Sequence, residues 1–216
     1  MYWARCPLTC LPPLLRSIAK KEISMLDRTN LNPPSALQDI EAATEAAGWT
    51  RISGPVTGSL LRTLAASKAG GSLLELGTGT GIGTAWILDG MHETSHLVTV
   101  DANESRSAIA RRYLGNDPRI TFKVMDGIAF MLSSQEASFD FIFVDIPPGK
   151  FHHLEEVLRL LKPGGIYIID HLLPEPDWEE DRPAKVQNLI ATLEQRPDLH
   201  VTRLDWSTGL LIAVKR

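Results

Sequence analysis

The spacing of apolar residues changes near residue 70 of the chain. Before that point, apolar side chains recur every three or four residues, which predicts helices over 36–47 and 57–68. Ser35 stands where the first helix needs an N-cap, and Gly48 follows its last turn. After that point, the apolar residues form short continuous runs bounded by turn residues, which is the pattern of buried strands.

These runs predict strands at 72–76, 96–101, 119–124, 139–145 and 165–170. Helical segments separate the strands, at 82–90, 104–114, 127–133 and 150–161. Continuous apolar strands that alternate with helices are covered on both faces. The pattern therefore predicts a parallel sheet in a doubly wound α/β fold.

The C-terminal part of the chain departs from this alternation. A helix near 183–195 is followed by apolar runs at 199–205 and 210–215, and only the short turn at 206–209 separates the two runs. A parallel pair of strands needs a crossover of about a dozen residues, so two strands joined by a tight turn are antiparallel. The sequence thus predicts seven strands, of which the last is antiparallel.

The composition limits the class of protein. The 216 residues are enough for one domain, and the apolar fraction of 44% and charged fraction of 22% exclude a disordered or fibrous chain. A net charge of −4 disfavours a nucleic-acid partner. No run reaches the roughly 20 apolar residues that span a membrane, so no membrane association is expected. The two cysteines, Cys6 and Cys10, are too few to stabilise a fold by disulfides, which favours a cytoplasmic location.

The chain is expected to divide at residue 34. Residues 1–34 should form an N-terminal extension that is poorly ordered in part, because nothing periodic in residues 1–24 could pack. Residues 35–216 should form a single domain, in which helices within 35–69 precede the sheet.

A glycine-rich loop follows the first expected strand and opens the next helix. It contains four alternating glycines, Gly77, Gly79, Gly81 and Gly83. In a doubly wound sheet a ligand binds at this place, because glycine lets the backbone approach it and the helix N-terminus offers unpaired N–H groups. The dinucleotide fingerprint G-x-G-x-x-G fails, since Ile82 and Thr84 occupy the two positions open to its third glycine. The alternative is a loop that serves only a tight turn.

The run from Glu75 to Gly81 resembles the E-x-G-x-G-x-G signature of class I S-adenosylmethionine-dependent methyltransferases. The stretch TGSLL at 57–61 is similar to the segment that covers the cofactor in small bacterial O-methyltransferases related to the catechol and caffeoyl-coenzyme A enzymes. The resemblance covers residues 55–216. It implies a Rossmann-like seven-stranded sheet of order 3-2-1-4-5-7-6, S-adenosylmethionine as cofactor and methylation of a hydroxyl on a small molecule. It also allows a homodimer.

The resemblance assigns the cofactor contacts. Asp101, at the end of the second strand, would accept the ribose hydroxyls, although it could instead be a solvated cap of the next helix. Asp126 would accept the adenine amine, cap a helix, or do both. Glu75 would face the methionine amino group. The full expected set is Gly58, Glu75, Gly77, Thr78, Gly79, Gly81, Asp101, Ala102, Asp126, Gly127 and Asp145.

A metal site is a first hypothesis for the chemistry. In the catechol-type relatives an Asp after the fourth strand and an Asp-Asn pair after the fifth hold a magnesium ion. Asp145 and Asp170 match two of these ligands, but His171 stands in place of the Asn and suits zinc, manganese or iron better. The Asp-Ala-Asp-Lys segment of those relatives is here DIPPGK, from Asp145 to Lys150.

The second hypothesis makes His171 a general base without a metal, oriented by Asp170 or Asp145, and it is narrowly favoured. The catalytic candidates are therefore His171, Asp145 and Lys150. His171 could also be a polar strand end without a chemical role. Lys150 would neutralise an acidic acceptor or only solvate the next helix, and His152 and His153 would lie on that helix. Trp178 would form an aromatic wall over the acceptor.

Two other functions compete with O-methylation. The stretch DIPP at 145–148 is similar to the [ND]-P-P-[YF] motif of amino-methyltransferases, although Ile146 interrupts it and Gly149 takes the aromatic position. An N-methyltransferase acting on a small amine or a protein is therefore one alternative. A catalytically silent cofactor-binding protein is the other.

Overall fold

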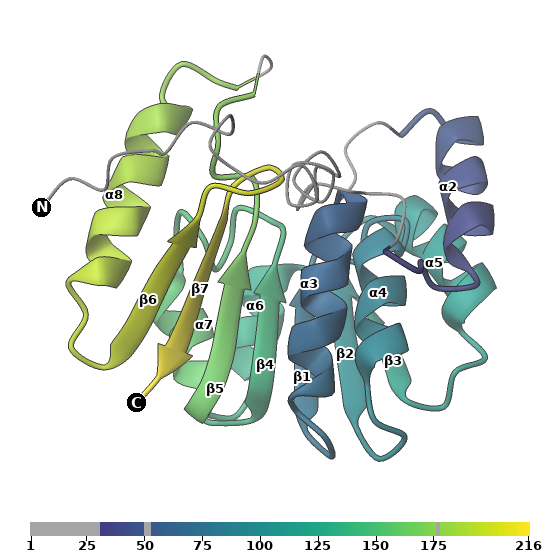
Figure 1. Cartoon of the computed structure of the whole chain (residues 1–216), viewed down its shortest axis with the longest axis horizontal. Helices are drawn as coiled ribbons and strands as arrows, with labels where there is room; N and C mark the ends of the chain where they lie inside the picture. Colours follow the sequence, from purple (N-terminus) through teal and green to yellow (C-terminus); the bar gives the residue numbers. More distant parts are fainter. Residues whose placement is uncertain (1–30, 50–52, 176–177) are drawn as a thin grey trace, which may run out of the picture. The chain divides into compact units, whose positions relative to one another are not determined.

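The computed structural model describes residues 31–49, 53–175 and 178–216, and its centre is one seven-stranded sheet of order β3-β2-β1-β4-β5-β7-β6 (Figure 1). The strands are β1 (Ser72–Leu76), β2 (His96–Asp101), β3 (Ile120–Val124), β4 (Phe139–Val144), β5 (Leu161–Ile169), β6 (Leu199–Leu204) and β7 (Leu210–Lys215). The first five strands pair in parallel, and β7 pairs antiparallel with both β5 and β6. The predicted fold class and strand order are confirmed.

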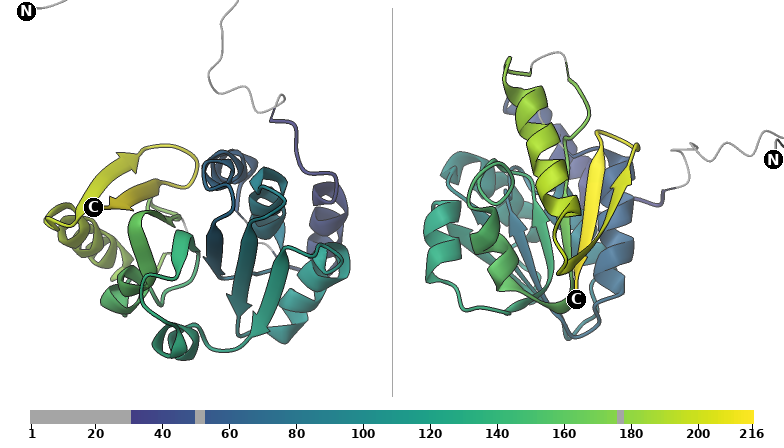
Figure 2. Two further views of the ribbon diagram at one scale, coloured as in Figure 1. Left: turned by 90° about the horizontal axis from the view of Figure 1, so that it is seen from below. Right: turned by 90° about the vertical axis from the view of Figure 1, so that its left-hand side faces the viewer.

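Helices cover both faces of the sheet (Figure 2). They are α2 (Leu37–Ala46), α3 (Pro55–Ala66), α4 (Ile82–Gly90), α5 (Glu104–Leu114), α6 (Gly127–Ser133), α7 (Leu154–Leu160) and α8 (Arg182–Glu194). Helices α2 to α5 pack into one apolar cluster, and α6 to α8 pack into a second one across the sheet. No helix in these described ranges is long and apolar enough to cross a membrane.

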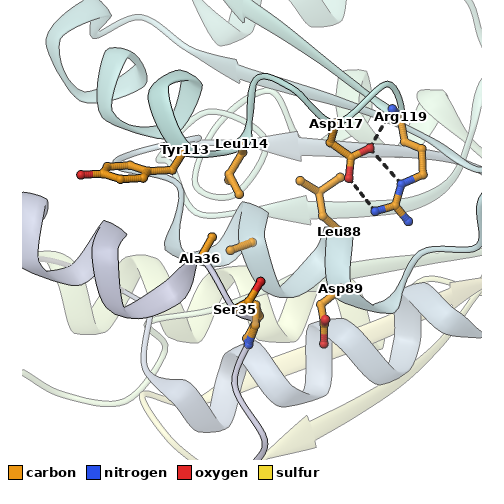
Figure 3. Close-up of a pocket in the computed structure, with 10 residues that line it drawn as sticks. Ser35, Ala36, Leu88, Asp89, Tyr113, Leu114, Asp117 and Arg119 are labelled. Carbon is orange, nitrogen blue, oxygen red and sulfur yellow. Dashed lines mark hydrogen bonds and ion pairs between the residues drawn. The ribbon is translucent and has the colours of Figure 1, made fainter.

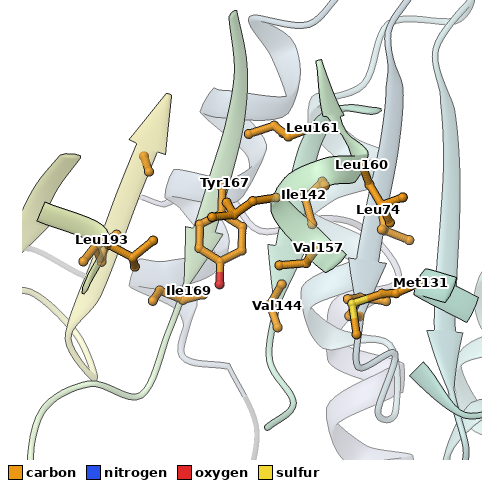
Figure 4. Close-up of a cluster of buried hydrophobic side chains, with 14 of the residues drawn as sticks. Leu74, Met131, Ile142, Val144, Val157, Leu160, Leu161, Tyr167, Ile169 and Leu193 are labelled. Carbon is orange, nitrogen blue, oxygen red and sulfur yellow. The ribbon is translucent and has the colours of Figure 1, made fainter. Parts of the chain in front are cut away.

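The core follows from alternation along the strands. Leu74 of β1 and Tyr167 of β5 point to the α6–α8 side, where they pack with Met131 and Leu193 (Figure 4). Leu73 points to the other face and joins the cluster of α2 to α5. All five side chains are fully buried. Successive side chains of a strand therefore pack into two separate cores, which explains why each strand is a continuous apolar run in the sequence.

Several predicted boundaries shift. Helix α7 begins at Leu154 rather than at 150, because the amides of Lys150 and Phe151 donate to the Pro147 carbonyl and close a turn first. The prediction that Ser35 is the N-cap was wrong, since Ala36 takes that position without a side-chain hydrogen bond. Strand β5 begins at Leu161, four residues earlier than predicted. The predicted extension lies mostly outside the described residues.

Helices α3 and α4 approach each other closely at two glycines. A Cβ on Gly58 would lie 2.3 Å from Cδ1 of Trp86, which is fully buried. A Cβ on Gly90 would lie 2.0 Å from the Arg62 carbonyl oxygen. Such contacts leave no room for a methyl group, so the sequence at both positions is fixed by helix packing.

We therefore expect Gly90→Ala to lower the free energy of unfolding by about 1–3 kcal/mol, because the new methyl group forces α3 and α4 apart. At an open helical position the same change raises the free energy of unfolding by about 0.4–1 kcal/mol. The sign of the change therefore distinguishes a packed glycine from an open one. Chemical denaturation measures it, with Ser105→Ala on the exposed side of α5 as a control that should change little. A Gly90→Ala protein more stable than the wild type would contradict the packing.

Candidate active site

Carboxyl groups gather at one edge of the sheet. Asp101 ends β2, while Asp126, Asp145 and Asp170 follow β3, β4 and β5 closely, and Glu75 is the penultimate residue of β1. These strands are parallel, so their carboxyl ends meet at the same edge. The glycine loop between β1 and α4 lies at this edge as well, where open α/β sheets bind ligands.

The glycine loop has a shape that needs its glycines. Gly77, Gly79 and Gly81 have φ angles of 108°, 53° and 98°, in the left-handed region that favours glycine. A Cβ on Gly81 would also lie 2.8 Å from the Cβ of Ala110. From the other side, Thr44 of α2 donates its hydroxyl to the Thr80 hydroxyl at 2.8 Å. The loop is therefore fixed between α2 and α5.

Asp101 anchors this loop. It is 5% exposed, its Oδ2 accepts the Gly79 amide at 2.8 Å, and its Oδ1 accepts the Asn103 amide at 2.8 Å. The expected alternative, a solvated cap of the next helix, was wrong, because the Asn103 side chain caps α5 by accepting the Arg106 amide. Each carboxylate oxygen has a second lone pair, so Asp101 can hold the loop and still accept hydrogen bonds from a ligand.

Glu75 is a buried acid at the centre of the site. It is 1% exposed, and its Oε2 accepts the hydroxyls of Thr84 at 2.5 Å and Thr99 at 2.6 Å. Burial raises the pKa of Glu75, and the hydrogen bonds from the two hydroxyls lower it. Burial has the larger effect, so the pKa is about 8. The other oxygen, Oε1, faces Gly83, where a Cβ would lie only 2.9 Å away. Without a positive partner, Glu75 is thus mostly protonated at pH 7.

A cavity of about 40 Å³ lies between the glycine loop and the end of β4, which is room for about three water molecules. Its lining residues are Ser53, Glu75, Gly77, Thr78, Gly79, Thr80, Ile82, Gly83 and Asp145. Five of them were expected cofactor contacts. The other four were not expected as contacts, although Thr80, Ile82 and Gly83 stand inside or directly after the glycine motif.

The other six expected cofactor contacts lie outside this cavity lining: Gly58, Gly81, Asp101, Ala102, Asp126 and Gly127. Ala102 and Asp126 are exposed, and Asp126 Oδ1 accepts the Ala129 amide at 2.9 Å as the N-cap of α6. Gly127 is buried, and a Cβ there would lie 2.9 Å from Cδ1 of Ile146. The capping role predicted for Asp126 is confirmed, and its role toward adenine stays a prediction.

His171 meets carboxylates beyond the end of β5. Its Nδ1 lies 3.1 Å from Oδ1 of Asp145 and 3.8 Å from Oδ2 of Asp170, and its Nε2 lies 3.9 Å from Oε1 of Glu175. Burial would lower the pKa of His171, but the contact with Asp145 outweighs it and raises the pKa above 6.5. Likewise, burial would raise the pKa of Asp145, but His171 and the nearby charge of Lys150 bring it below 3.8.

Lys150 is a buried cation rather than a solvated one. It is 3% exposed, and its Nζ donates to the backbone carbonyl of Asp170 at 2.8 Å. The expectation that it solvates the start of a helix was wrong, because the Pro147–Gly149 turn directs it inward. Burial lowers the pKa of Lys150. The ammonium ties the end of β4 to the end of β5 and partly neutralises Asp145.

The remaining candidates lie around this cluster. His152 forms a β-bridge with Pro148, and His153 is the N-cap of α7 with a φ of 57°, so neither lies within the helix as expected. Trp178 packs against the core beside the Arg182 guanidinium, which is 5.6 Å from its ring and 4.1 Å from the ring of Phe151. Its predicted role as a wall over the acceptor stays a prediction.

The proposed metal ligands do not fit a metal ion. Among the described residues, no three His, Cys, Asp or Glu side chains form a group that could hold one. Asp170 is fully buried, and its Oδ1 already accepts the Thr208 hydroxyl at 2.5 Å and the His171 amide at 2.7 Å. The Lys150 ammonium lies close by and would repel a cation. The predicted ligand set of Asp145, Asp170 and His171 stays a prediction.

A second, larger cavity of about 190 Å³ lies between the start of α2, α4 and α5 (Figure 3). Arg119 there donates to both oxygens of Asp117, at 2.9 and 2.6 Å. None of the expected site residues lines this cavity. The expected site residues therefore lie at the sheet edge and not at this larger opening.

Comparisons with known proteins agree with this placement. A family model described as a methyltransferase domain matches residues 74–172, which run from the start of the glycine motif to just beyond His171. The "Putative O-methyltransferase" of Mycolicibacterium vanbaalenii is 33% identical over 121 residues, which are 53% of this chain and 53% of that protein. The chain therefore spans about half the length of this relative.

Two solved structures share the fold. The Bacillus cereus O-methyltransferase in complex with SAH has a TM-score of 0.74 at 21% identity and covers 97% of this chain and 100% of that one. The Streptomyces achromogenes O-methyltransferase involved in tomaymycin synthesis, in complex with SAM, has a TM-score of 0.70 at 22% identity, covering 84% and 89%. Residues 74–172 thus match a methyltransferase domain, and the glycine motif, the sheet order and the relatives make the chain similar to the small bacterial O-methyltransferases in sequence and fold.

Proposed function

We propose that this protein transfers the methyl group of S-adenosylmethionine to a hydroxyl oxygen of a small molecule. The observation that carries the proposal is the position of Asp145. Its carboxylate lines the cavity beside the glycine loop and also lies 3.1 Å from Nδ1 of His171. A proton acceptor therefore stands next to the expected cofactor site, as methyl transfer to a hydroxyl requires.

The residues at the glycine loop fit the cofactor chemically. Asp101 would accept the ribose hydroxyls, and Oε1 of Glu75 would accept the methionine ammonium. The cofactor supplies an electrophilic methyl group on a positively charged sulfur. A cationic ammonium beside Glu75 favours its ionised form, so we expect Glu75 to release a proton when the cofactor binds near neutral pH.

His171 would remove the proton from the acceptor hydroxyl. The Asp145 carboxylate favours the tautomer that carries its proton on Nδ1, which leaves Nε2 free to accept one. With the cofactor bound, the methyl carbon would leave the cofactor sulfur as it joins the acceptor oxygen, the hydroxyl proton would move to Nε2 of His171, and Asp145 would stabilise the imidazolium that results. Lys150 would hold the ends of β4 and β5 in place. The homodimer and the cytoplasmic location stay predictions.

A panel of phenols and amines, with SAH formation as the measurement, tests the proposal. Turnover with phenols is the expected result. SAH formation with amines alone would replace the proposal with N-methylation. Binding of SAH without turnover across a broad panel would favour a silent cofactor-binding protein.

Replacing Asp101 with Ala should weaken SAH binding about ten- to a hundredfold, because a charge-assisted contact is lost and the Gly79 and Asn103 amides lose their acceptor. Titration calorimetry measures the affinity, and thermal unfolding checks the fold of each variant. Glu104→Gln, an exposed acid of α5, is the control and should bind SAH like the wild type. If a folded Asp101→Ala protein keeps the wild-type affinity, Asp101 does not hold the cofactor.

Replacing Glu75 with Gln should change how the stability of the protein depends on pH. Because the folded-state pKa is raised to about 8 from 4.5, the folded protein holds one more proton than the unfolded chain between these values. The contribution of Glu75 to the free energy of unfolding is therefore fully present below pH 4.5 and is lost as the pH rises to about 8. Relative to the wild type, Glu75→Gln should gain stability across this range, by at most about 5 kcal/mol. Chemical denaturation at several pH values measures the difference; a constant difference would mean that Glu75 is ionised throughout.

Replacing His171 with Ala tests its role as the base. In His171→Ala, kcat with a phenol that the wild type methylates should fall about 10²- to 10⁴-fold, while SAH affinity stays unchanged, because only the proton transfer is lost. The wild-type kcat/KM should decline on the acid side with a midpoint above 6.5, since only neutral His171 accepts a proton and Asp145 raises its pKa. A chelator should leave the rate unchanged. Loss of turnover in chelator, recovered with Mn²⁺ or Zn²⁺, would instead establish the metal hypothesis.

A further inference from the structure

The turn between β6 and β7 lies against the segment that carries His171. The Leu172 amide donates to the Gly209 carbonyl at 3.1 Å, and the Leu173 amide donates to the Thr208 carbonyl at 2.9 Å. A Cβ on Gly209, whose φ is 82°, would lie 2.6 Å from Leu173. Two backbone hydrogen bonds and a close approach therefore hold the turn directly beside the end of β5.

One side chain of this turn reaches the site. The Thr208 hydroxyl donates to Oδ1 of Asp170 at 2.5 Å, and the same oxygen accepts the His171 amide at 2.7 Å. The other oxygen, Oδ2, lies 3.8 Å from Nδ1 of His171 and has no hydrogen-bond partner among the described residues. Two donors on Oδ1 fix the plane of the carboxylate and thereby direct Oδ2 at the imidazole.

His171 depends on this support because of its own backbone. Its φ of 62° lies in the left-handed region, which costs a non-glycine residue free energy unless its surroundings hold it there. The hydrogen bond from its amide to Asp170 is one such restraint. Asp170 in turn is fully buried and cannot replace a lost hydroxyl donor with bulk water.

We propose that Thr208 is a positioning residue for methyl transfer: through Asp170 it holds the imidazole of His171 in the orientation needed to accept the proton. The proposal rests on the proposed function, in which His171 is the base. Thr208 does not line the cavity at the glycine loop, so we expect its effect in kcat and not in cofactor affinity.

The neighbouring residue offers a matched control. Ser207 belongs to the same turn, and its Oγ accepts the hydroxyl of Thr57 of α3 at 3.0 Å. Ser207→Ala therefore removes one side-chain hydrogen bond from the same turn without touching Asp170. Thr208→Val removes the donor at nearly constant volume, and Thr208→Ser retains it.

The experiment compares these variants in the full chain, with a phenol that the wild type methylates. Thr208→Val should lower kcat about tenfold or more, since small misplacements of a catalytic group are costly, and should leave SAH affinity unchanged. Thr208→Ser should restore most of the rate, and Ser207→Ala should keep kcat. In a His171→Ala background, Thr208→Val should cause no further loss, because both changes act through one group.

The ring resonances of His171, assigned by their absence in His171→Ala, give a readout that needs no turnover. Thr208→Val should shift or broaden them, and Thr208→Ser and Ser207→Ala should not. The proposal would be overturned if Thr208→Val leaves the His171 resonances or kcat unchanged. It would also be overturned if Thr208→Val lowers the rate of the His171→Ala protein as much as it lowers the rate of the wild type. If the wild type methylates nothing, the proposed function fails, while the resonances alone still decide whether Thr208 positions the ring.

Discussion

The arrangement of five parallel strands places five carboxyl groups at one edge of the sheet, and three of them, Glu75, Asp101 and Asp170, are almost fully buried. Like charges that are buried close together raise the free energy of burying each carboxylate, so each acid has to be protonated or to accept hydrogen bonds. Glu75 keeps its proton, and backbone amides bond Asp101. Several contacts of the loop and of the strand ends therefore stabilise buried acids.

The acids are stabilised differently on the two sides of the site, which divides it into two halves. On the β1 and β2 side, Glu75 accepts two hydroxyl donors, while Asp101 accepts two backbone amides and lies 3.6 Å from the Arg106 guanidinium. On the β4 and β5 side, Lys150 and His171 supply the positive charge internally, and Asp145 joins the halves because it contacts both. Under the proposed function, the first half would hold the cationic cofactor and the second half would carry the proton transfer.

The sequence was sufficient for what depends on local pattern. Runs of apolar residues located the strands, and alternating glycines located the loop. It was insufficient where a side chain depends on a distant segment. Nothing near Lys150 signals its burial, because the carbonyl that it bonds is 20 residues away. Likewise, the contact of Thr208 with Asp170 depends on how β7 pairs with β5, which the spacing of apolar residues does not specify.

The link between Thr57 and Ser207 spans 150 positions in the chain, whereas the bonds of Glu75 and Asp101 to the glycine loop and β2 span 9 to 24. Closing a long loop costs more entropy than closing a short one, so distant contacts form after local ones unless the intervening chain is already folded. The half of the site around the glycine loop can thus become native early in folding. The half around His171 also needs the β6–β7 turn in place, so its geometry depends on the pairing of the last strand.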